Sequence, residues 1–172
     1  MTPVRFYDAK ERPYGFFSNY ALSPLRIEGK DYASVEHYYQ SQKYAGVNEE
    51  LVETIRTAKT PHQAKVIASM RQGGGYGWRT ALNPVIARFQ EQGALLRKDW
   101  EEVKEDVMRS GLRAKFAQNP QLAKLLRDTG TNPLIENSAS DDCWGCGADG
   151  NGKNRLGALL AEVRTELATV SV

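Results

Sequence analysis

Three polar residues, Glu36, Gln40 and Lys43, recur at a spacing that would place them on one face of a helix. Residues four and three positions apart are neighbours on a helix surface, so a carboxylate, an amide and an amine would lie in one line. Such a group could do acid–base or nucleophilic chemistry, because a lysine that has lost its proton is a nucleophile. A solvated face with a contact between Glu36 and Lys43 would give the same pattern, and periodicity alone favours that plainer interpretation.

A second strip of polar residues lies a hundred positions further on and contains Glu136, Asp141 and Trp144. Carboxylates beside a tryptophan suit a site that stacks a planar base and stabilises a developing positive charge. Aromatic residues also crowd the region around the first group: Phe16, Phe17, Tyr20, Tyr32, Tyr38, Tyr39 and Tyr44. The two segments together therefore indicate a candidate site for a planar ligand.

The Gly-rich stretch near the C-terminus is similar to two nucleotide-binding motifs but lacks their context. Gly147–Lys153 has the spacing of a P-loop, yet Asn154 stands where a magnesium-binding Ser or Thr belongs, and no buried strand precedes it. Gly145, Gly147 and Gly150 match the dinucleotide fingerprint without a βαβ unit around them. What remains is a set of backbone N–H groups near a helix start, which could hold an anion.

Neither a metal nor a cofactor is expected. Cys143 and Cys146 form a C-x-x-C pair, but structural zinc would need two more ligands, and His37 and His62 lie far away in sequence. A redox role would need a βαβ setting, which the sequence lacks. His37 follows Glu36 and could act as a base, although packing or surface exposure is the commoner role of a single histidine on a helix.

The elements that must carry these residues are mostly helices. Ser34 is a candidate N-cap for a helix that runs to about Ala45, and Thr60–Gln63 is a strong start signal for another. Residues 72–77 (QGGGYG) cannot be a helix interior, because each glycine there is unfavourable, and are expected to form a mobile loop. Further helices are expected after Asn48, Asn83, Asp99, Asn119 and Asn154, and short strands at Val4–Tyr7, Leu25–Ile27 and Leu134–Glu136.

Length and composition fit one average globular domain. The chain has 172 residues, 41% hydrophobic and 26% charged, with a formal net charge of +2, so composition alone names no partner. We find no window apolar enough for a transmembrane helix and no apolar core of a signal peptide, and two cysteines favour the reducing cytoplasm. We expect a single, mostly helical α+β domain over residues 1–172 with a few short strands, an insertion near 72–92, and a monomer that does not bind a membrane.

Two ordered groups of motifs carry a family resemblance. The first is Phe16-Phe17-Ser18-Asn19-Tyr20, followed by Tyr32-Ala33-Ser34-Val35-Glu36-His37-Tyr38-Tyr39-Gln40-x-x-Lys43. The second comprises Met108, Leu112, Lys115-Phe116, Leu126, Thr129-Gly130, Glu136, Ser138, Asp141, Trp144-Gly145, Gly152, Asn154 and Leu156-Gly157. Their order and spacing resemble the NADAR family of YbiA-like N-glycosidases from about Val4 to Arg164. The long stretch 72–92 and the cysteines that flank Trp144-Gly145 depart from the family pattern.

The resemblance implies a mostly helical α+β domain that hydrolyses N-glycosidic bonds. Two substrate types are associated with it: ADP-ribose attached to guanine in nucleic acid, which we favour, and the ribosylamino-pyrimidine phosphates of riboflavin synthesis. In both, ribose C1 is bonded to an amine nitrogen outside the ring. A non-catalytic module that binds ADP-ribose or NAD is the main alternative, and a P-loop-like nucleotide hydrolase is a third, against which Asn154 argues.

Within this resemblance, Lys43 is the expected nucleophile or electrostatic partner at C1, and Glu36 would hold or deprotonate it. Asp141 or Glu136 would act as the general acid or base. The expected substrate-binding residues are Phe17 and Trp144, which would stack a base, together with Ser18, Asn19, Gln40, Gly145, Gly150, Gly152 and Asn154.

A basic stretch in the middle of the chain could contact nucleic acid through phosphate pairing and stacking. It contains Arg71, Arg79, Arg88, Arg97 and Lys98, with Tyr76 and Trp78 among them. A solvated loop and helix would account for these residues equally well.

Overall fold

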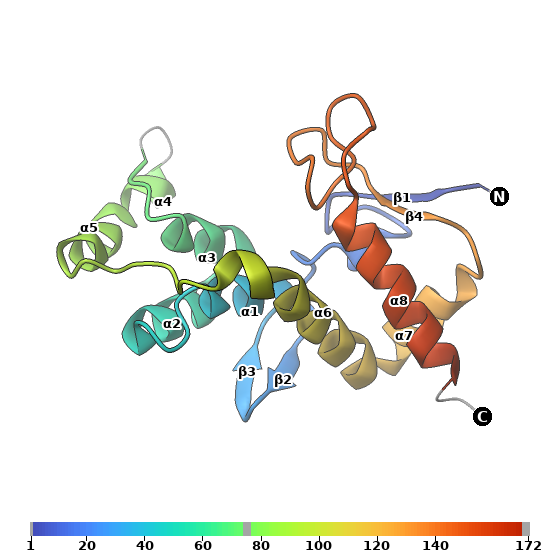
Figure 1. Ribbon diagram of the computed structural model, residues 1–172, viewed down its shortest axis with the longest axis horizontal. Helices are drawn as coiled ribbons and strands as arrows, with labels where there is room; N and C mark the ends of the chain where they lie inside the picture. The colour runs from blue at the N-terminus through green and yellow to red at the C-terminus, as the bar shows by residue number, and fades with distance from the viewer. Residues whose placement is uncertain (1, 74–76, 170–172) are drawn as a thin grey trace.

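The computed structural model describes residues 2–73 and 77–169, which form a mostly helical α+β fold (Figure 1). The strands are β1 (Val4–Phe6), β2 (Leu25–Ile27), β3 (Lys30–Tyr32) and β4 (Leu134–Glu136). The α-helices are α1 (Val35–Gln42), α2 (Glu49–Arg56), α3 (Pro61–Ala68), α4 (Gly77–Thr80), α5 (Asn83–Glu91), α6 (Trp100–Gln118), α7 (Pro120–Asp128) and α8 (Arg155–Thr169), and a 3₁₀ turn, η1, spans Gly15–Phe17. In the described part of the chain, no helix is both long and apolar enough to cross a membrane.

The helix starts that the sequence predicts are confirmed, and three have their predicted caps. The side chain of Ser34 accepts a hydrogen bond from His37 N, that of Asn48 from Leu51 N, and that of Thr60 from Gln63 N. Each bond satisfies a backbone N–H that the first helical turn leaves without a partner. The predicted mobile loop at 72–77 falls largely on residues 74–76, outside the described residues.

Two small sheets join distant or adjacent parts of the chain. β1 pairs with β4 in parallel, with Phe6 opposite Glu136, and β2 pairs with β3 as an antiparallel hairpin. The hairpin turns at Glu28 and Gly29, both with positive φ, a conformation that short turns require. β1 and β4 are far apart in the sequence, as the strands of a parallel pair can be because their connection is long. Their pairing brings the second polar strip beside the start of the chain.

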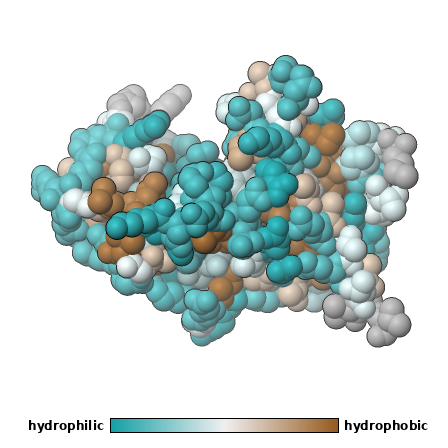
Figure 2. Space-filling model, in the orientation of Figure 1, coloured by the Kyte–Doolittle hydropathy of each residue, from teal (hydrophilic) through white to brown (hydrophobic). Residues whose placement is uncertain are grey.

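Two hydrophobic clusters form the core. The larger gathers side chains of β1, α1, α6, α7 and α8, and includes Phe6, Phe17, Phe116 and Leu160. The smaller gathers residues of α2, α3 and α5 around Leu51, Ile55 and Phe89. Figure 1 shows α1 and α6 between the lobe of α2–α5 and the lobe of α7, α8, β1 and β4. Hydrophilic side chains cover most of the face in Figure 2, whose outline is notched between the two lobes.

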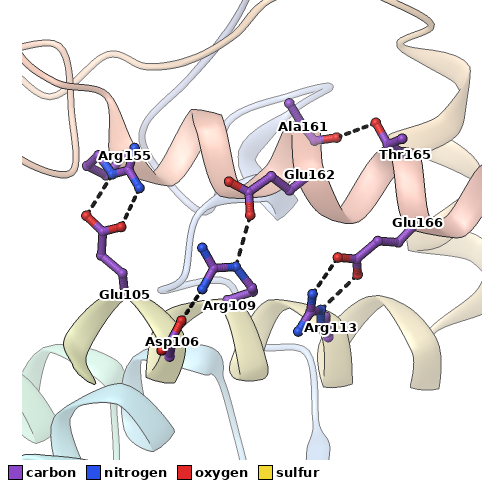
Figure 3. Close-up of polar contacts among 9 residues, drawn as sticks. All are labelled: Glu105, Asp106, Arg109, Arg113, Arg155, Ala161, Glu162, Thr165 and Glu166. Atoms are coloured by element: carbon purple, nitrogen blue, oxygen red, sulfur yellow. Dashed lines mark hydrogen bonds and ion pairs between the residues drawn. The ribbon is translucent and has the colours of Figure 1, made fainter. Parts of the chain in front are cut away.

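Ion pairs line the seam between α6 and α8 (Figure 3). Glu105 pairs with Arg155, Arg109 with Glu162, and Arg113 with Glu166. Each such surface pair is worth only about 0–1 kcal/mol, so the buried apolar side chains of α6 and α8 contribute most to their packing. The pair between Glu105 and Arg155 joins the first residue of α8 to α6.

A wholly buried lysine ties α6 to the loop that precedes β2. The Nζ atom of Lys115, 0% exposed, donates to the carbonyl oxygens of Phe16 at 2.5 Å and Ser18 at 3.1 Å. Burial lowers the pKa of Lys115 to about 7. These two bonds fix the position of the segment that leads into Asn19.

Candidate functional site

One large cavity, of about 1660 Å³, brings the two polar segments together. From α1 it is lined by Glu36, Tyr39, Gln40 and Lys43, and from β4 and the loop after it by Glu136, Ser138, Ser140, Asp141 and Trp144. Residues 7–13 and 18–24 line it from the N-terminal loops, and α3 contributes its start and Lys65. The cavity therefore lies where α1, α3 and the loop after β4 meet.

Glu36 lies at the buried centre of the site and is 2% exposed. Its carboxylate accepts hydrogen bonds from Asn19 Nδ2 and from Gln40 Nε2, the latter at 2.8 Å. Burial raises the pKa of Glu36, while the bond from Gln40 and the charges of Lys65 and Lys43 act in the opposite direction. The interpretation of the first polar group as a solvated face is therefore wrong for Glu36 and Gln40.

Lys43 is the C-cap of α1, and its amine points over aromatic rings. The Nζ atom lies 5.6 Å from the centre of the Tyr39 ring and 5.7 Å from that of Trp100. It forms no ion pair or hydrogen bond with any residue that the structure describes. Burial lowers the pKa of Lys43, and Lys65 lowers it further, against Glu36 and Glu101. An unpaired amine with a lowered pKa loses its proton more readily than a surface lysine.

Glu136, at the end of β4, is a buried acid. It is 9% exposed, and its Oε2 atom has no hydrogen-bond partner within the described ranges. Burial, with smaller effects of Asp141 and Glu36, raises the pKa of Glu136 to about 7. A carboxylic acid that keeps its proton near neutral pH can donate that proton to a leaving group.

Asp141 has a structural task in this site. Its Oδ1 atom accepts from the backbone N–H groups of Cys143 at 2.9 Å and Trp144 at 2.7 Å. The turn that results places Trp144 edge-on to Tyr39, with ring centres 5.5 Å apart. Of the two carboxylates expected as general acid, Glu136 is thus the buried one with a raised pKa, and one oxygen of Asp141 positions the tryptophan.

Not every expected residue lines the cavity. Ser18, Asn19, Gln40 and Trp144 do, whereas Phe17 is buried in the large core cluster and its neighbour Phe16 lines the cavity instead. Gly145, Gly150 and Gly152 are not among the lining residues. A Cβ at Gly145 would lie 2.7 Å from Ser138 Cβ, so this glycine permits the close packing of the loop rather than contact with a ligand.

Asn154 also lies outside the cavity lining and holds β4 in place. Its Nδ2 donates to Leu134 O at 2.8 Å, and its Oδ1 accepts from Glu136 N at 2.9 Å. The residue has a φ of 49°, which asparagine tolerates better than most residues. The side chain that was expected to bind the ligand is thus occupied by the backbone on both sides of Ile135.

The change Asn154→Ala is expected to lower the free energy of unfolding by about 2 kcal/mol. Two hydrogen bonds are lost, and alanine at a positive φ is strained. Urea denaturation followed by circular dichroism measures the effect. Asn151→Ala is the matched control, because the side chain of this exposed residue of the same loop hydrogen-bonds to Asp149 and to no other described residue, and it should change stability by less than about 0.5 kcal/mol. Unchanged stability with a strong loss of ligand affinity would instead assign Asn154 to ligand binding.

His37 has a packing role. Its Nε2 lies 3.0 Å from Ala58 O and its Nδ1 lies 2.8 Å from Ser34 Oγ. Because a carbonyl only accepts, Nε2 carries the proton and Nδ1 accepts from the serine. Burial lowers the pKa of His37, so a neutral imidazole joins α1 to the segment before α3, and the preferred interpretation of this residue is confirmed.

The cavity lining includes residues that were not expected to contribute to the site, among them Tyr20, Tyr39 and Lys65. Burial, and then Glu36, raise the pKa of Tyr20, and the Lys65 amine lies 5.8 Å from the centre of the Tyr20 ring. The crowd of aromatic residues was a signal for both tyrosines. The sequence contained no signal for Lys65, because only the packing of α3 against α1 places its side chain in the cavity.

The basic stretch does not line the cavity. Arg88 pairs with Glu50 and Arg97 with Asp99, so two of its charges are already matched. Trp78 packs on His62 with ring centres 5.1 Å apart, and Tyr76 lies outside the described residues. Cys143 and Cys146 are free thiols, and no cluster of three metal-binding side chains occurs in residues 2–73 and 77–169.

The mostly helical α+β domain thus brings a buried acid, a second carboxylate and an unpaired lysine into one cavity, which are groups that acid–base and nucleophilic chemistry require. The chain belongs to the NADAR domain family, whose model matches residues 5–168. It is 40% identical over 167 residues to the N-glycosidase YbiA of Shigella boydii serotype 4, covering 97% of this chain and 89% of that protein.

Two further comparisons extend this result. The NMR structure of the Escherichia coli protein YbiA aligns with a TM-score of 0.77 and 38% identity, covering 98% of this chain and 86% of that one. The riboflavin biosynthesis protein PYRR, chloroplastic, of Zea mays is 36% identical over 163 residues, which cover 90% of this chain and 23% of that larger protein. The fold expected from the sequence is thereby confirmed.

Proposed function

We propose that this chain is an N-glycosidase that cleaves the bond between ribose C1 and an exocyclic amine nitrogen, and that it removes ADP-ribose from guanine bases in nucleic acid. One observation carries the chemistry: an unpaired lysine amine with a lowered pKa shares a cavity with a buried glutamic acid whose pKa is about 7. A nucleophile and a proton donor are what cleavage of such a bond needs.

The enzyme class is the one that the relatives share. Proteins that align along nearly their whole length with this chain are named N-glycosidases, and the chain is a hydrolase acting on N-glycosyl bonds. This chain belongs to the same family, and its cavity is lined on one side by Glu36, Gln40 and Lys43.

The proposed reaction runs through an imine. The ribose ring opens, which gives an imine between C1 and the exocyclic nitrogen. The Lys43 amine adds to C1 and passes one proton to the exocyclic nitrogen. Glu136 gives that nitrogen a second proton as its bond to C1 breaks, so the base leaves as an amine and a protonated Schiff base remains on Lys43. The resulting Schiff base on Lys43 is then hydrolysed by water, which returns a proton to Glu136 and releases the sugar aldehyde.

The size of the cavity and three of the cations that line it support a large, phosphate-bearing ligand. Its volume of about 1660 Å³ exceeds the roughly 300–1,000 Å³ that is usual for a drug-sized ligand. Lys10, Arg12 and Lys65 line it, and none of them forms an ion pair with a described residue. Such cations are available for phosphate groups.

The alternative substrate is a ribosylamino-pyrimidine phosphate. A relative from Zea mays is named a riboflavin biosynthesis protein, which favours this second candidate. The proposal also includes the expectation from the sequence that the protein is a monomer in the cytoplasm.

A side-by-side assay tests the choice of substrate. We expect kcat/KM to be at least about 10-fold higher on an oligonucleotide that carries ADP-ribosylated guanine than on the free ribosylamino-pyrimidine phosphate, because only the larger ligand fills the cavity. Released sugar is quantified by mass spectrometry. A reversed preference would assign the enzyme to the second substrate, and binding of ADP-ribose without turnover of either compound would identify a binding module.

A further inference from the structure

We propose that Gln40 recognises the ribose 2′-hydroxyl and makes the enzyme specific for ribosyl over 2′-deoxyribosyl substrates. The inference rests on the proposed N-glycosidase function and adds to it a determinant of sugar specificity. Gln40 lines the cavity and is only 4% exposed. Its Oε1 atom nevertheless has no hydrogen-bond partner in the described residues.

The orientation of the Gln40 amide is fixed by its neighbour. Its Nε2 atom donates to Glu36 Oε1 at 2.8 Å, and Asn19 Nδ2 donates to the other oxygen of the same carboxylate. If the amide were turned over, its oxygen would face a carboxylate oxygen, and two acceptors repel. The nitrogen therefore stays on Glu36, and Oε1 is left as an acceptor without a donor.

A buried acceptor without a partner costs free energy, which a ligand can recover by supplying a donor. Phosphate oxygens are acceptors when ionised and cannot do so. A sugar hydroxyl can, because an O–H group donates. The group that meets Gln40 is thus a hydroxyl of the ribose rather than a phosphate.

Helix geometry selects which hydroxyl. Gln40 lies on α1 and Lys43 is its C-cap three residues later, and both line the cavity, so the residue with the free acceptor neighbours the residue whose amine is proposed to attack C1. In the open imine that Lys43 attacks, C1 is bonded to C2′ and to the exocyclic nitrogen. That nitrogen has given up its hydrogen in forming the neutral imine, so the hydroxyl on C2′ is the donor next to C1. The 2′-hydroxyl is therefore the group that lies within reach of Gln40.

The test compares ribosyl and 2′-deoxyribosyl substrates in wild-type enzyme and in Gln40→Met. Because the two sugars differ in intrinsic reactivity, the quantity measured is the ratio of their kcat/KM values and its change on mutation, in which that difference cancels. We expect the ratio to fall at least about 30-fold in Gln40→Met, since a site built to bind a hydroxyl discriminates strongly against its absence. An unchanged ratio, with both substrates slowed alike, would overturn the proposal and leave Gln40 as a support of Glu36.

Two controls separate these roles. Asn19→Ala removes the other donor to Glu36 and should slow both substrates while it preserves their ratio. Gln118→Met removes a cavity-lining glutamine whose amide is fully used by Arg26, and it should leave the ratio unchanged.

A binding measurement on the wild-type protein needs neither a variant nor turnover. Methyl ribofuranoside 5-phosphate, which cannot open to an aldehyde, should bind at least about 10-fold more tightly than its 2-deoxy counterpart by calorimetry. Equal affinities would overturn the assignment of the 2′-hydroxyl. Preferential binding of the ribosyl compound in a protein that turns over no substrate would uphold the inference about Gln40 while the proposed catalytic function fails.

Discussion

Replacement of Lys43 by methionine is expected to lower kcat/KM at least about 1,000-fold, which is the scale of losing a nucleophile that acts together with its partner groups. Methionine keeps an apolar stem against Tyr39 and Trp100, so packing is retained while the amine is lost. The lowered pKa of Lys43, caused first by burial, is the reason that this amine can attack near neutral pH. Steady-state rates and a thermal melt of both proteins measure the effect.

Chemical trapping shows whether Lys43 acts covalently. Sodium borohydride added during turnover should reduce the Schiff base, and peptide mass spectrometry should find the sugar remnant on Lys43. Lys65→Met is the matched control, because Lys65 lies in the same cavity and should not be needed for the adduct. If no adduct forms and Lys43→Met keeps substantial activity, the imine route is wrong.

Replacement of Glu136 by glutamine is the second change with a large expected effect, about 100- to 1,000-fold in kcat/KM. A general acid with a pKa of about 7 is protonated below that pH, so wild-type activity should decline as the pH rises above 7. Glutamine cannot donate this proton. The Glu136→Gln variant should therefore have low activity at every pH, without the further decline above pH 7. The pH profile of kcat/KM provides the measurement.

Controls distinguish Glu136 from its neighbours. Glu11→Gln changes an exposed, cavity-lining carboxylate and should preserve the alkaline decline. Asp141→Asn keeps an oxygen that can accept from the Trp144 N–H group, so it should retain both the position of Trp144 and the alkaline decline. An alkaline decline that survives in Glu136→Gln but is lost in Asp141→Asn would exchange the two roles.

The raised pKa of Glu136 also predicts a change in stability with pH. Its pKa in the folded chain is raised from 4.5 to about 7, so folding favours the protonated form. The resulting stabilisation is complete below pH 4.5 and is lost as the pH rises through 7. Glu136→Gln should therefore gain stability relative to wild type as the pH rises over this range, as measured by urea denaturation.

Local rules explain what could be predicted from the sequence. The starts of α1, α2 and α3 follow from Ser34, Asn48 and Thr60, because a cap acts within three residues of its own position. The alignment of Glu36, Gln40 and Lys43 follows from the period of a helix. Family membership could also be predicted, since two ordered motif groups span most of the chain.

Packing between distant segments decided the rest. Phe16 and Phe17 are adjacent aromatic residues, and only their surroundings direct one to the cavity and the other to the core. Asn154 hydrogen-bonds to the backbone of β4 instead of lining the cavity. Lys65 lines the cavity because α3 packs beside α1.

The sequence alone thus determined most of the helix starts, the family and one polar face. The helix α4 (Gly77–Thr80) was not predicted, and α1 ends at Gln42 rather than near Ala45. The tertiary structure decided that this face is buried, that Glu136 stays protonated near neutral pH, and that Gln40 keeps an oxygen without a partner. The physical reason is that caps and helix periodicity act over a few residues, whereas burial and the pairing of polar atoms depend on segments a hundred residues apart.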